Sequence, residues 1–430
     1  MKKEVFKSIL VEWFERKLPS LIERELKVTP NKELITAIIG PRRVGKTYLM
    51  FSIIENLLKT HSKEEIIFID FEDNRLSGMK PQDLDDLFVA HSEISSKKAK
   101  YLFFDEIQEV PQWSKFLRRL NNLGQYNIVI SGSSSKLASN EVATELRGRY
   151  KSHLLLPFSF AEFLIVRGFA YDLKTSYSSE KKGELNRLFE EYTKYGGYPQ
   201  IVKAETITEK RELAKTYFET IFYKDILERY AINNRDIIEM LMNYILSNNS
   251  STFSTNSFNK ILKANSIKAS TKTISLYLKY LEESFFVLTL QKFSYSARIR
   301  LMNPKKIYLV DNCFQTFLST NSTEDKGKLL ESLIMQETKR RNIETYYFKE
   351  TKECDFILKQ GQSILSANQV TYELSPQNQD REINGLLQAS NSLKIKNNTI
   401  ITLDQKQEII KGNQKICVQP AWKWLLENNK

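Results

Sequence analysis

Apolar residues follow two different spacings in the first third of the chain. Short apolar runs, rich in β-branched and aromatic side chains, occur at residues 34–39, 66–71, 101–104 and 127–131. Such runs are typical of buried strands. Between them the apolar positions recur every three or four residues, as at Leu49, Ile53 and Leu57, which is helical spacing. Strands that alternate with helices predict the fold class α/β with a parallel sheet.

The remainder of the chain has a different pattern. Residues 159–234 show mostly helical spacing. Three helices are predicted between residues 236 and 287, followed by a strand pair near 286–293 and 306–310. Beyond Lys326 the pattern predicts a helix, several strands and a further helix, so the chain holds more than one domain.

The first apolar run leads directly into the segment IIGPRRVGKTYLM. Its two glycines lie between a predicted strand and a predicted helix, where the phosphate-binding pattern G-x-x-x-x-G-K-[ST] belongs. Glycines allow the backbone N–H groups to turn inward toward phosphate oxygens, and the helix N-terminus adds its dipole. The predicted nucleotide-binding residues are Gly40, Pro41, Arg42, Arg43, Val44, Gly45, Lys46, Thr47 and Tyr48.

Two further residue types of this loop carry defined roles. Lys46 is expected to reach the β- and γ-phosphates, and the Thr47 hydroxyl is expected to ligate Mg²⁺. The predicted cofactors are therefore ATP and Mg²⁺.

An acidic pair separates an ATPase from a small-molecule kinase. The strand at 101–104 ends in Asp105 and Glu106. Asp105 is expected to hold Mg²⁺, usually through water, and Glu106 to polarise the water that attacks the γ-phosphate. A kinase has little use for Glu106 because it must avoid hydrolysis, so the pair favours an ATPase.

Three more residues are candidates for the same reaction. Ser133 follows the next strand, where a polar side chain could sense the γ-phosphate. Arg147 and Arg149 lie in one loop, and either is a candidate arginine finger, within one subunit or across the interface of an oligomer.

Six motifs together resemble a known family: GPRRVGKT, YLFFDEIQEVPQW, ISGSSSKL, LRGRY, LPFSFAEF and YGGYPQ. In this order they are similar to the prokaryotic ATP-binding proteins that join an AAA-type P-loop core to a C-terminal domain of unknown function, within the archaeal-ATPase-like group. The resemblance implies ATP at residues 40–47, hydrolysis assisted by Glu106, a sensor near Ser133 and a helical lid after Phe160. It supplies no cellular role.

Composition narrows the classes of site and partner. Three scattered cysteines and three histidines favour neither a disulfide framework nor a zinc site. The first residues lack the apolar core of a signal peptide, and no apolar run approaches the length of a membrane span, so we expect a soluble cytoplasmic protein with no membrane partner.

The net charge of +12 is unevenly distributed. Residues 251–306 hold ten basic and two acidic residues, which gives this window a charge of 10 − 2 = +8. The window also carries two helix-capping signals, at Ser254 or Thr255 and at Ser270 or Thr271, before the predicted strand pair. Two capped helices and a strand pair predict a winged helix-turn-helix, with nucleic acid or a protein as partner. The candidate nucleic-acid contacts are Lys260, Lys263, Lys272 and Lys279.

The last domain has the acidic pattern of PD-(D/E)xK nucleases. Glu331 lies on a predicted helix, and Asp355 and Gln369 lie on the strands that follow. Carboxylates in this arrangement bind Mg²⁺, and a lysine supports the attacking water. Thr371 stands where the lysine belongs, and no replacement is evident nearby, so the pattern predicts a nuclease-like fold without cleavage.

These features divide the chain into an N-terminal helix and connection (1–30), a P-loop ATPase core (31–158), a helical lid (159–235), a winged helix (236–310) and a nuclease-like α/β domain (311–430). The predicted function is an ATPase that acts as a nucleotide-dependent switch on nucleic acid or a protein partner. Two alternatives stay open: an ATP-gated DNA nuclease, and an ATP-bound adaptor with negligible turnover.

Overall fold

The computed structural model describes residues 2–134, 137, 146, 148–172, 178–232, 234–320 and 325–427. The chain divides into two compact units, Met1–Leu155 and Leu156–Lys430, and each is described by itself. Among the helices of these described ranges, none is both long enough and apolar enough to cross a membrane.

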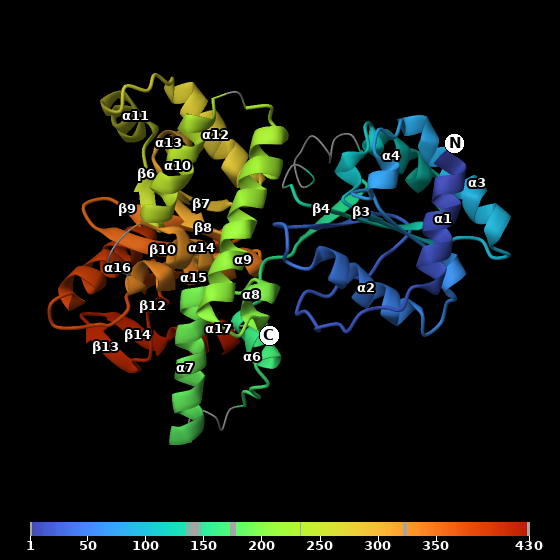
Figure 1. The fold of residues 1–430 in the computed structure, drawn as a ribbon. Helices are drawn as coiled ribbons and strands as arrows, with labels where there is room; N and C mark the ends of the chain where they lie inside the picture. The colour runs from blue at the N-terminus through green and yellow to red at the C-terminus, as the bar shows by residue number, and fades with distance from the viewer. Residues whose placement is uncertain are drawn as a thin grey trace. The chain divides into compact units, whose positions relative to one another are not determined.

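The first unit is built on a five-stranded sheet whose paired strands are all parallel (Figure 1). Its strands are β1 Ile35–Ile39, β2 Ile66–Asp70, β3 Tyr101–Asp105, β4 Asn127–Gly132 and β5 Tyr150–Leu154, in the order β2-β3-β4-β1-β5. Every residue of β1 and β4 is buried, because neighbours cover both faces of a central parallel strand. The predicted α/β class with a parallel sheet is confirmed.

Helices precede and connect these strands. They are α1 Lys2–Glu15, α2 Lys46–Leu57, α3 Asp85–Ile94 and α4 Trp113–Leu123, with short 3₁₀ turns at η1 Lys63–Glu65, η2 Asn74–Leu76, η3 Pro81–Leu84 and η4 Ile107–Glu109. Figure 1 shows α2 on one face of the sheet and α4 on the other. The indole N–H of Trp13 donates to the carbonyl of Ile66 at 2.7 Å, so the N-terminal helix packs against β2 and forms part of this unit.

Parallel pairing brings the carboxyl ends of the strands to one edge of the sheet. Asp70 lies opposite Asp105 in the register of β2 and β3, and Ile39 lies opposite Gly132 in that of β1 and β4. Ligands bind at this edge in open α/β sheets. The P-loop and the acidic pair therefore meet there.

The second unit begins with the helical region. Its elements are α6 Phe160–Val166, α7 Ser179–Tyr195, α8 Pro199–Lys203, α9 Ile207–Thr220 and the π-helix η7 Ile221–Glu228, followed by α10 Arg235–Ser247. The turn between α7 and α8 contains Gly196 and Gly197, and the N–H of Gly197 donates to Asp311 at 2.8 Å. A Cβ on Gly196 would lie 1.7 Å from the same carboxylate, so only glycine fits there. The predicted lid is thus tied to the C-terminal half of its own unit.

A nine-stranded mixed sheet spans the rest of the second unit, in the order β13-β14-β12-β11-β10-β9-β7-β8-β6. The strands are β6 Ser251–Phe253, β7 Val287–Lys292, β8 Lys305–Leu309, β9 Glu344–Lys349, β10 Glu353–Gln360, β11 Ser363–Val370, β12 Asn398–Thr402, β13 Gln407–Lys411 and β14 Gln414–Pro420. The predicted strand pair forms β7 and β8. Because β7 pairs with β9, the sheet continues across the division expected at residue 310.

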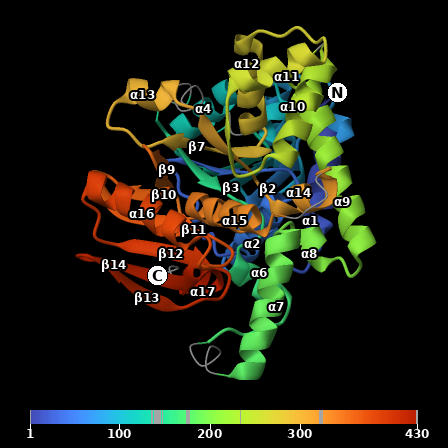
Figure 2. The same cartoon turned by 90° about the vertical axis from the view of Figure 1, so that its left-hand side faces the viewer.

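The remaining helices flank this sheet (Figure 2). They are α11 Thr255–Ala264, α12 Thr271–Glu283, α13 Ala297–Met302, α14 Asn312–Leu318, α15 Lys326–Arg340, α16 Gln379–Leu393 and α17 Ala421–Glu427. The side chains of Ser254 and Ser270, one of the two candidates at each position, cap α11 and α12. Residues 235–309 thus follow the order α10-β6-α11-α12-β7-α13-β8.

Candidate functional site

The P-loop joins β1 to α2 at the carboxyl edge of the first sheet. Gly45 has φ 95°, in the region that favours glycine. Gly40 approaches the backbone so closely that a Cβ would lie 2.0 Å from the carbonyl oxygen of Leu155. Both glycines of the pattern are therefore required by the shape of the turn.

Lys46, the first residue of α2, is buried beside this loop. Its ammonium donates to the carbonyls of Gly40 and Pro41, at 3.3 and 3.2 Å. It also pairs with Oε1 of Glu106 at 3.1 Å. The positive charge thus lies between the loop and the acidic pair, where a point charge can reach phosphate oxygens.

Asp105 ends β3 and faces α2. The Thr47 hydroxyl donates to its Oδ2 at 2.5 Å, and the Ser131 hydroxyl donates to its Oδ1. Burial, together with the negative charge of Glu106, raises the pKa of Asp105 to about 6. A hydroxyl and a carboxylate that converge on one point are hard oxygen ligands, so these two residues fit Mg²⁺.

Glu106 adopts φ 50°, which turns its side chain from the end of β3 toward Lys46. Its Oε2 accepts hydrogen bonds from the side-chain amide of Gln108 at 2.5 Å and from the N–H of Ser133 at 3.0 Å. Burial opposes ionisation, but the Lys46 ammonium and the Gln108 hydrogen bond outweigh it and lower the pKa of Glu106 to about 2. Glu106 is therefore an ionised acceptor in a buried site.

The other predicted residues of this site have different outcomes. Ser133 lies beside Glu106 through its backbone N–H, and a sensing role for its side chain stays a prediction. Arg147 lies outside the described residues.

Arg149 precedes β5 at the amino edge of the sheet, since Tyr150 pairs with Ile35 and Leu154 with Ile39. Five residue steps along the strand separate Arg149 from Leu154, so it lies about 16 Å from the P-loop edge. Its side chain donates to Asn122. It is therefore not positioned as a finger for its own subunit, and a role across an interface stays a prediction.

Several residues of the site were not predicted from the sequence. Asp70 ends an apolar strand, as Asp105 does, so its position could have been read from the sequence. In the structure, burial raises the pKa of Asp70. Ser131 and Gln108 gave no such signal, because only their contacts with the acidic pair distinguish them.

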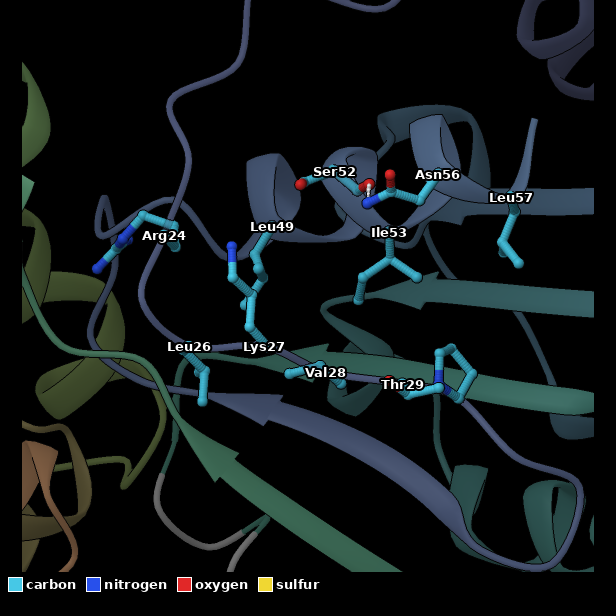
Figure 3. A pocket seen from close by; sticks show the side chains of 11 residues that line it. Arg24, Leu26, Lys27, Val28, Thr29, Leu49, Ser52, Ile53, Asn56 and Leu57 are labelled. Carbon is cyan, nitrogen blue, oxygen red and sulfur yellow. Dashed lines mark hydrogen bonds between the residues drawn. The ribbon is translucent and has the colours of Figure 1, made fainter. Parts of the chain in front are cut away.

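A cavity of about 270 Å³ lies along α2 (Figure 3). It is lined by Arg24, Leu26, Lys27, Val28, Thr29, Pro30, Leu49, Ser52, Ile53, Asn56 and Leu57. Figure 3 shows Leu49 and Ile53 extending from α2 toward the segment that carries Leu26 and Val28. The Arg24 guanidinium donates to the Val44 carbonyl at 2.9 Å, so the cavity adjoins the P-loop. A hollow of mixed apolar and polar lining beside a phosphate-binding turn can accommodate a nucleotide base.

The four candidate nucleic-acid lysines are all exposed. Lys260 and Lys263 lie on α11, and Lys272 and Lys279 lie seven residues apart on one face of α12. Lys279 also pairs with Glu283 at 3.6 Å. The exposed positive charge of the predicted basic window is smaller than +8, because Lys306 is buried among carboxylates.

Lys306 corrects the prediction for the C-terminal acidic cluster. Its ammonium lies 3.0 Å from Glu331, 2.7 Å from Glu353 and 2.9 Å from Asp355. The prediction that no lysine replaces the one missing at Thr371 was wrong. Lys306 comes from β8, which contributes to the same sheet as β10.

The other residues of the nuclease-like pattern are also buried. Gln369 accepts from the backbone N–H of Asp355 at 3.2 Å and donates to Glu382 at 2.7 Å. The hydroxyl of Thr371 donates to the Glu373 carbonyl. Within the described part of the chain, no three histidine, cysteine or acidic side chains form a group that could hold a metal ion.

Two segments of the chain match known family models. The model of an AAA domain matches residues 32–164, and a domain of unknown function (DUF8612) matches residues 186–325. The Walker-type ATPase paby2304 of Pyrococcus abyssi is 14% identical with a TM-score of 0.41, over 74% of this chain and 95% of that one. The ORC1 protein of Aeropyrum pernix, solved in complex with DNA, is 12% identical with a TM-score of 0.30, over 79% and 93%.

Two relatives are similar along most of their length. An uncharacterized protein of Haemophilus influenzae is 28% identical over 367 residues, which is 85% of this chain and 88% of that protein. The uncharacterized protein MJ1544 of Methanocaldococcus jannaschii is 36% identical over 445 residues, which is 99% of this chain and 96% of that protein. This chain therefore belongs to the same family as MJ1544, and its N-terminal unit carries an AAA-type P-loop ATPase domain.

Proposed function

We propose that this protein binds ATP with Mg²⁺, hydrolyses it, and acts as a nucleotide-dependent switch on a nucleic-acid or protein partner. The observation that carries the proposal is the convergence of Lys46, Thr47, Asp105 and Glu106 at one edge of a parallel sheet. A phosphate-binding turn, a pair of oxygen ligands and a buried carboxylate are the parts that γ-phosphate hydrolysis needs.

Each residue has a distinct task in this reaction. The N–H groups of the P-loop and the α2 N-terminus bind the phosphates, and Lys46 exchanges its contact with Glu106 for phosphate oxygens. Thr47 and Asp105 would hold Mg²⁺, which would neutralise charge on the phosphates. Glu106 then accepts a proton from the attacking water.

The test of this function is ATP hydrolysis by the purified full chain, with and without duplex DNA. Turnover supports the ATPase, and its change on adding DNA supports the switch. Absence of turnover under both conditions would favour the alternative of an ATP-bound adaptor.

The cavity along α2 is the proposed site of the nucleotide base. Ile53→Trp fills this cavity, so ATP affinity should fall at least about tenfold, or roughly 1.4 kcal/mol. Inorganic tripolyphosphate should bind equally to both forms, because it uses only the P-loop. Titration of both ligands by calorimetry measures this, with Leu123→Trp on exposed surface as the control. Equal ATP affinity in Ile53→Trp would place the base elsewhere.

The second unit supplies the proposed partner surface. The order α10-β6-α11-α12-β7-α13-β8 supports a winged helix-turn-helix with the short α13 between its two strands and α12 as the recognition helix. Its exposed lysines favour an anionic partner.

If these lysines meet phosphates, duplex DNA should bind with a steep salt dependence. Each single replacement by Ala should reduce the slope of the logarithm of the binding constant against the logarithm of the salt concentration by about one unit. The four replacements are at Lys260, Lys263, Lys272 and Lys279. Fluorescence anisotropy over a salt series measures the slope, and Lys396→Ala, which removes an exposed lysine of the distant C-terminal region, should leave it unchanged. No DNA binding at low salt would assign the surface to a protein partner.

A further inference from the structure

Gln108 has an unusual place next to the acidic pair. It belongs to the short turn η4, directly after Glu106, and its amide nitrogen donates to Oε2 of that residue at 2.5 Å. The N–H of Ser133 donates to the same oxygen at 3.0 Å. These two donors hold one carboxylate oxygen of Glu106 in place, while Lys46 contacts the other.

The amide oxygen of Gln108 is buried and has no hydrogen-bond partner within the described part of the chain. A buried carbonyl without a donor is costly and rare, so a donor that arrives during function would remove that cost. A water molecule is such a donor, provided that it has other polar partners nearby.

The backbone around Gln108 leaves room for this oxygen. A Cβ on Gly132 would lie 1.9 Å from a methyl carbon of Leu137 and 2.5 Å from this oxygen, so the glycine at the end of β4 leaves space for both side chains. Gly132 pairs with Ile39, the residue directly before the P-loop. The unpartnered oxygen therefore lies at the edge of the sheet where the γ-phosphate of ATP is expected.

We propose that Gln108 orients the attacking water: its amide nitrogen fixes Glu106 and its amide oxygen accepts a hydrogen bond from the water. The inference rests on the proposed ATPase function and deepens it. Two acceptors, Glu106 and Gln108, then define the direction of the water's oxygen lone pair toward phosphorus.

The reaction balances without any further reactant. The water oxygen forms a bond to the γ-phosphorus, and the bond from phosphorus to the bridging oxygen breaks, so that ADP leaves with that oxygen. One proton of the water passes to Glu106 and is later released to solvent. The other hydrogen stays bonded to the water oxygen and donates to Gln108 until phosphate departs.

The experiment compares wild type, Gln108→Met and Gln108→Glu in the full chain. Methionine keeps the length of the side chain but removes both the donor and the acceptor. Glutamate keeps an acceptor but removes the donor and adds a charge beside Glu106. We expect kcat to fall on the order of tenfold to a hundredfold in both. In Gln108→Met, which adds no charge near the phosphates, the dissociation constant of a fluorescent ATP analogue should stay within about twofold of wild type.

A transition-state mimic separates this role from a purely structural one. ADP with aluminium fluoride imitates the γ-phosphate and its attacking water, so its affinity should fall in Gln108→Met by about the same factor as kcat. The affinity for ADP alone should not change. The matched control is Gln125→Met, which alters an exposed glutamine of the same unit and should behave as wild type.

The outcomes distinguish the two proposals. Turnover by wild type with an unchanged kcat in Gln108→Met would overturn the role of Gln108 and leave the ATPase standing. No turnover by wild type, with or without duplex DNA, would overturn the proposed function and this inference with it. Equal loss of ADP affinity and kcat would show that Gln108 only maintains the shape of the site, which also overturns the inference.

Discussion

Glu106→Gln is expected to bind ATP as wild type does and to hydrolyse it about a hundredfold more slowly. The amide keeps the size of the side chain but cannot accept a proton at neutral pH, whereas the buried carboxylate is ionised because the pKa of Glu106 lies at about 2. Release of phosphate under single-turnover conditions measures the effect, with a fluorescent ATP analogue to check binding. ATP hydrolysis by Glu106→Gln at the wild-type rate would show that another group accepts the proton.

Lys46→Ala tests the other half of the same site. The ammonium lies between the loop carbonyls and Glu106, so its loss removes the positive charge that the phosphates meet. ATP affinity should fall for this reason, in contrast to Glu106→Gln. Equal ATP affinity in wild type and Lys46→Ala would remove the basis for placing ATP at the P-loop.

Lys306→Met is expected to destabilise the second unit by about 3–5 kcal/mol, the usual cost of removing one partner from a buried ion pair. Three carboxylates, those of Glu331, Glu353 and Asp355, lose their shared counter-charge. Urea denaturation measures the loss, and Lys396→Met serves as an exposed control. If Lys306→Met does not fold, the double variant Lys306→Met, Glu331→Gln should recover part of the stability, because one repelling charge is removed. A urea denaturation midpoint of Lys306→Met equal to that of wild type would contradict this prediction.

The same cluster bears on the alternative of an ATP-gated nuclease. Lys306 contacts all three carboxylates, so its ammonium already pairs with the groups that would otherwise hold a metal ion. We therefore expect no Mg²⁺-dependent cleavage of plasmid DNA by wild type. Robust cleavage that Asp355→Ala abolishes would make the ATP-gated nuclease the better proposal.

Sequence alone determined the P-loop and the parallel sheet around it. The glycines, Lys46 and Thr47 are neighbours in the chain because a single strand-to-helix turn supplies the phosphate-binding groups. The strands were readable because burial on both faces leaves continuous apolar runs. Asp105 and Glu106 were readable because they directly follow such a run.

Tertiary structure decided every feature that depends on distant pairing. Lys306 meets Asp355 across 49 residues of chain because β8 and β10 contribute to one sheet, and no local pattern encodes that meeting. Arg149 lies at the wrong edge for its own P-loop because the parallel register of β5 fixes its position. Nothing in the local sequence distinguishes Gln108 from an ordinary exposed glutamine. Its contact with Glu106 and the space beside Gly132 are visible only in the folded unit. Side-chain type and short spacing can be read from the chain, whereas strand register and close approach are set by packing of the whole unit.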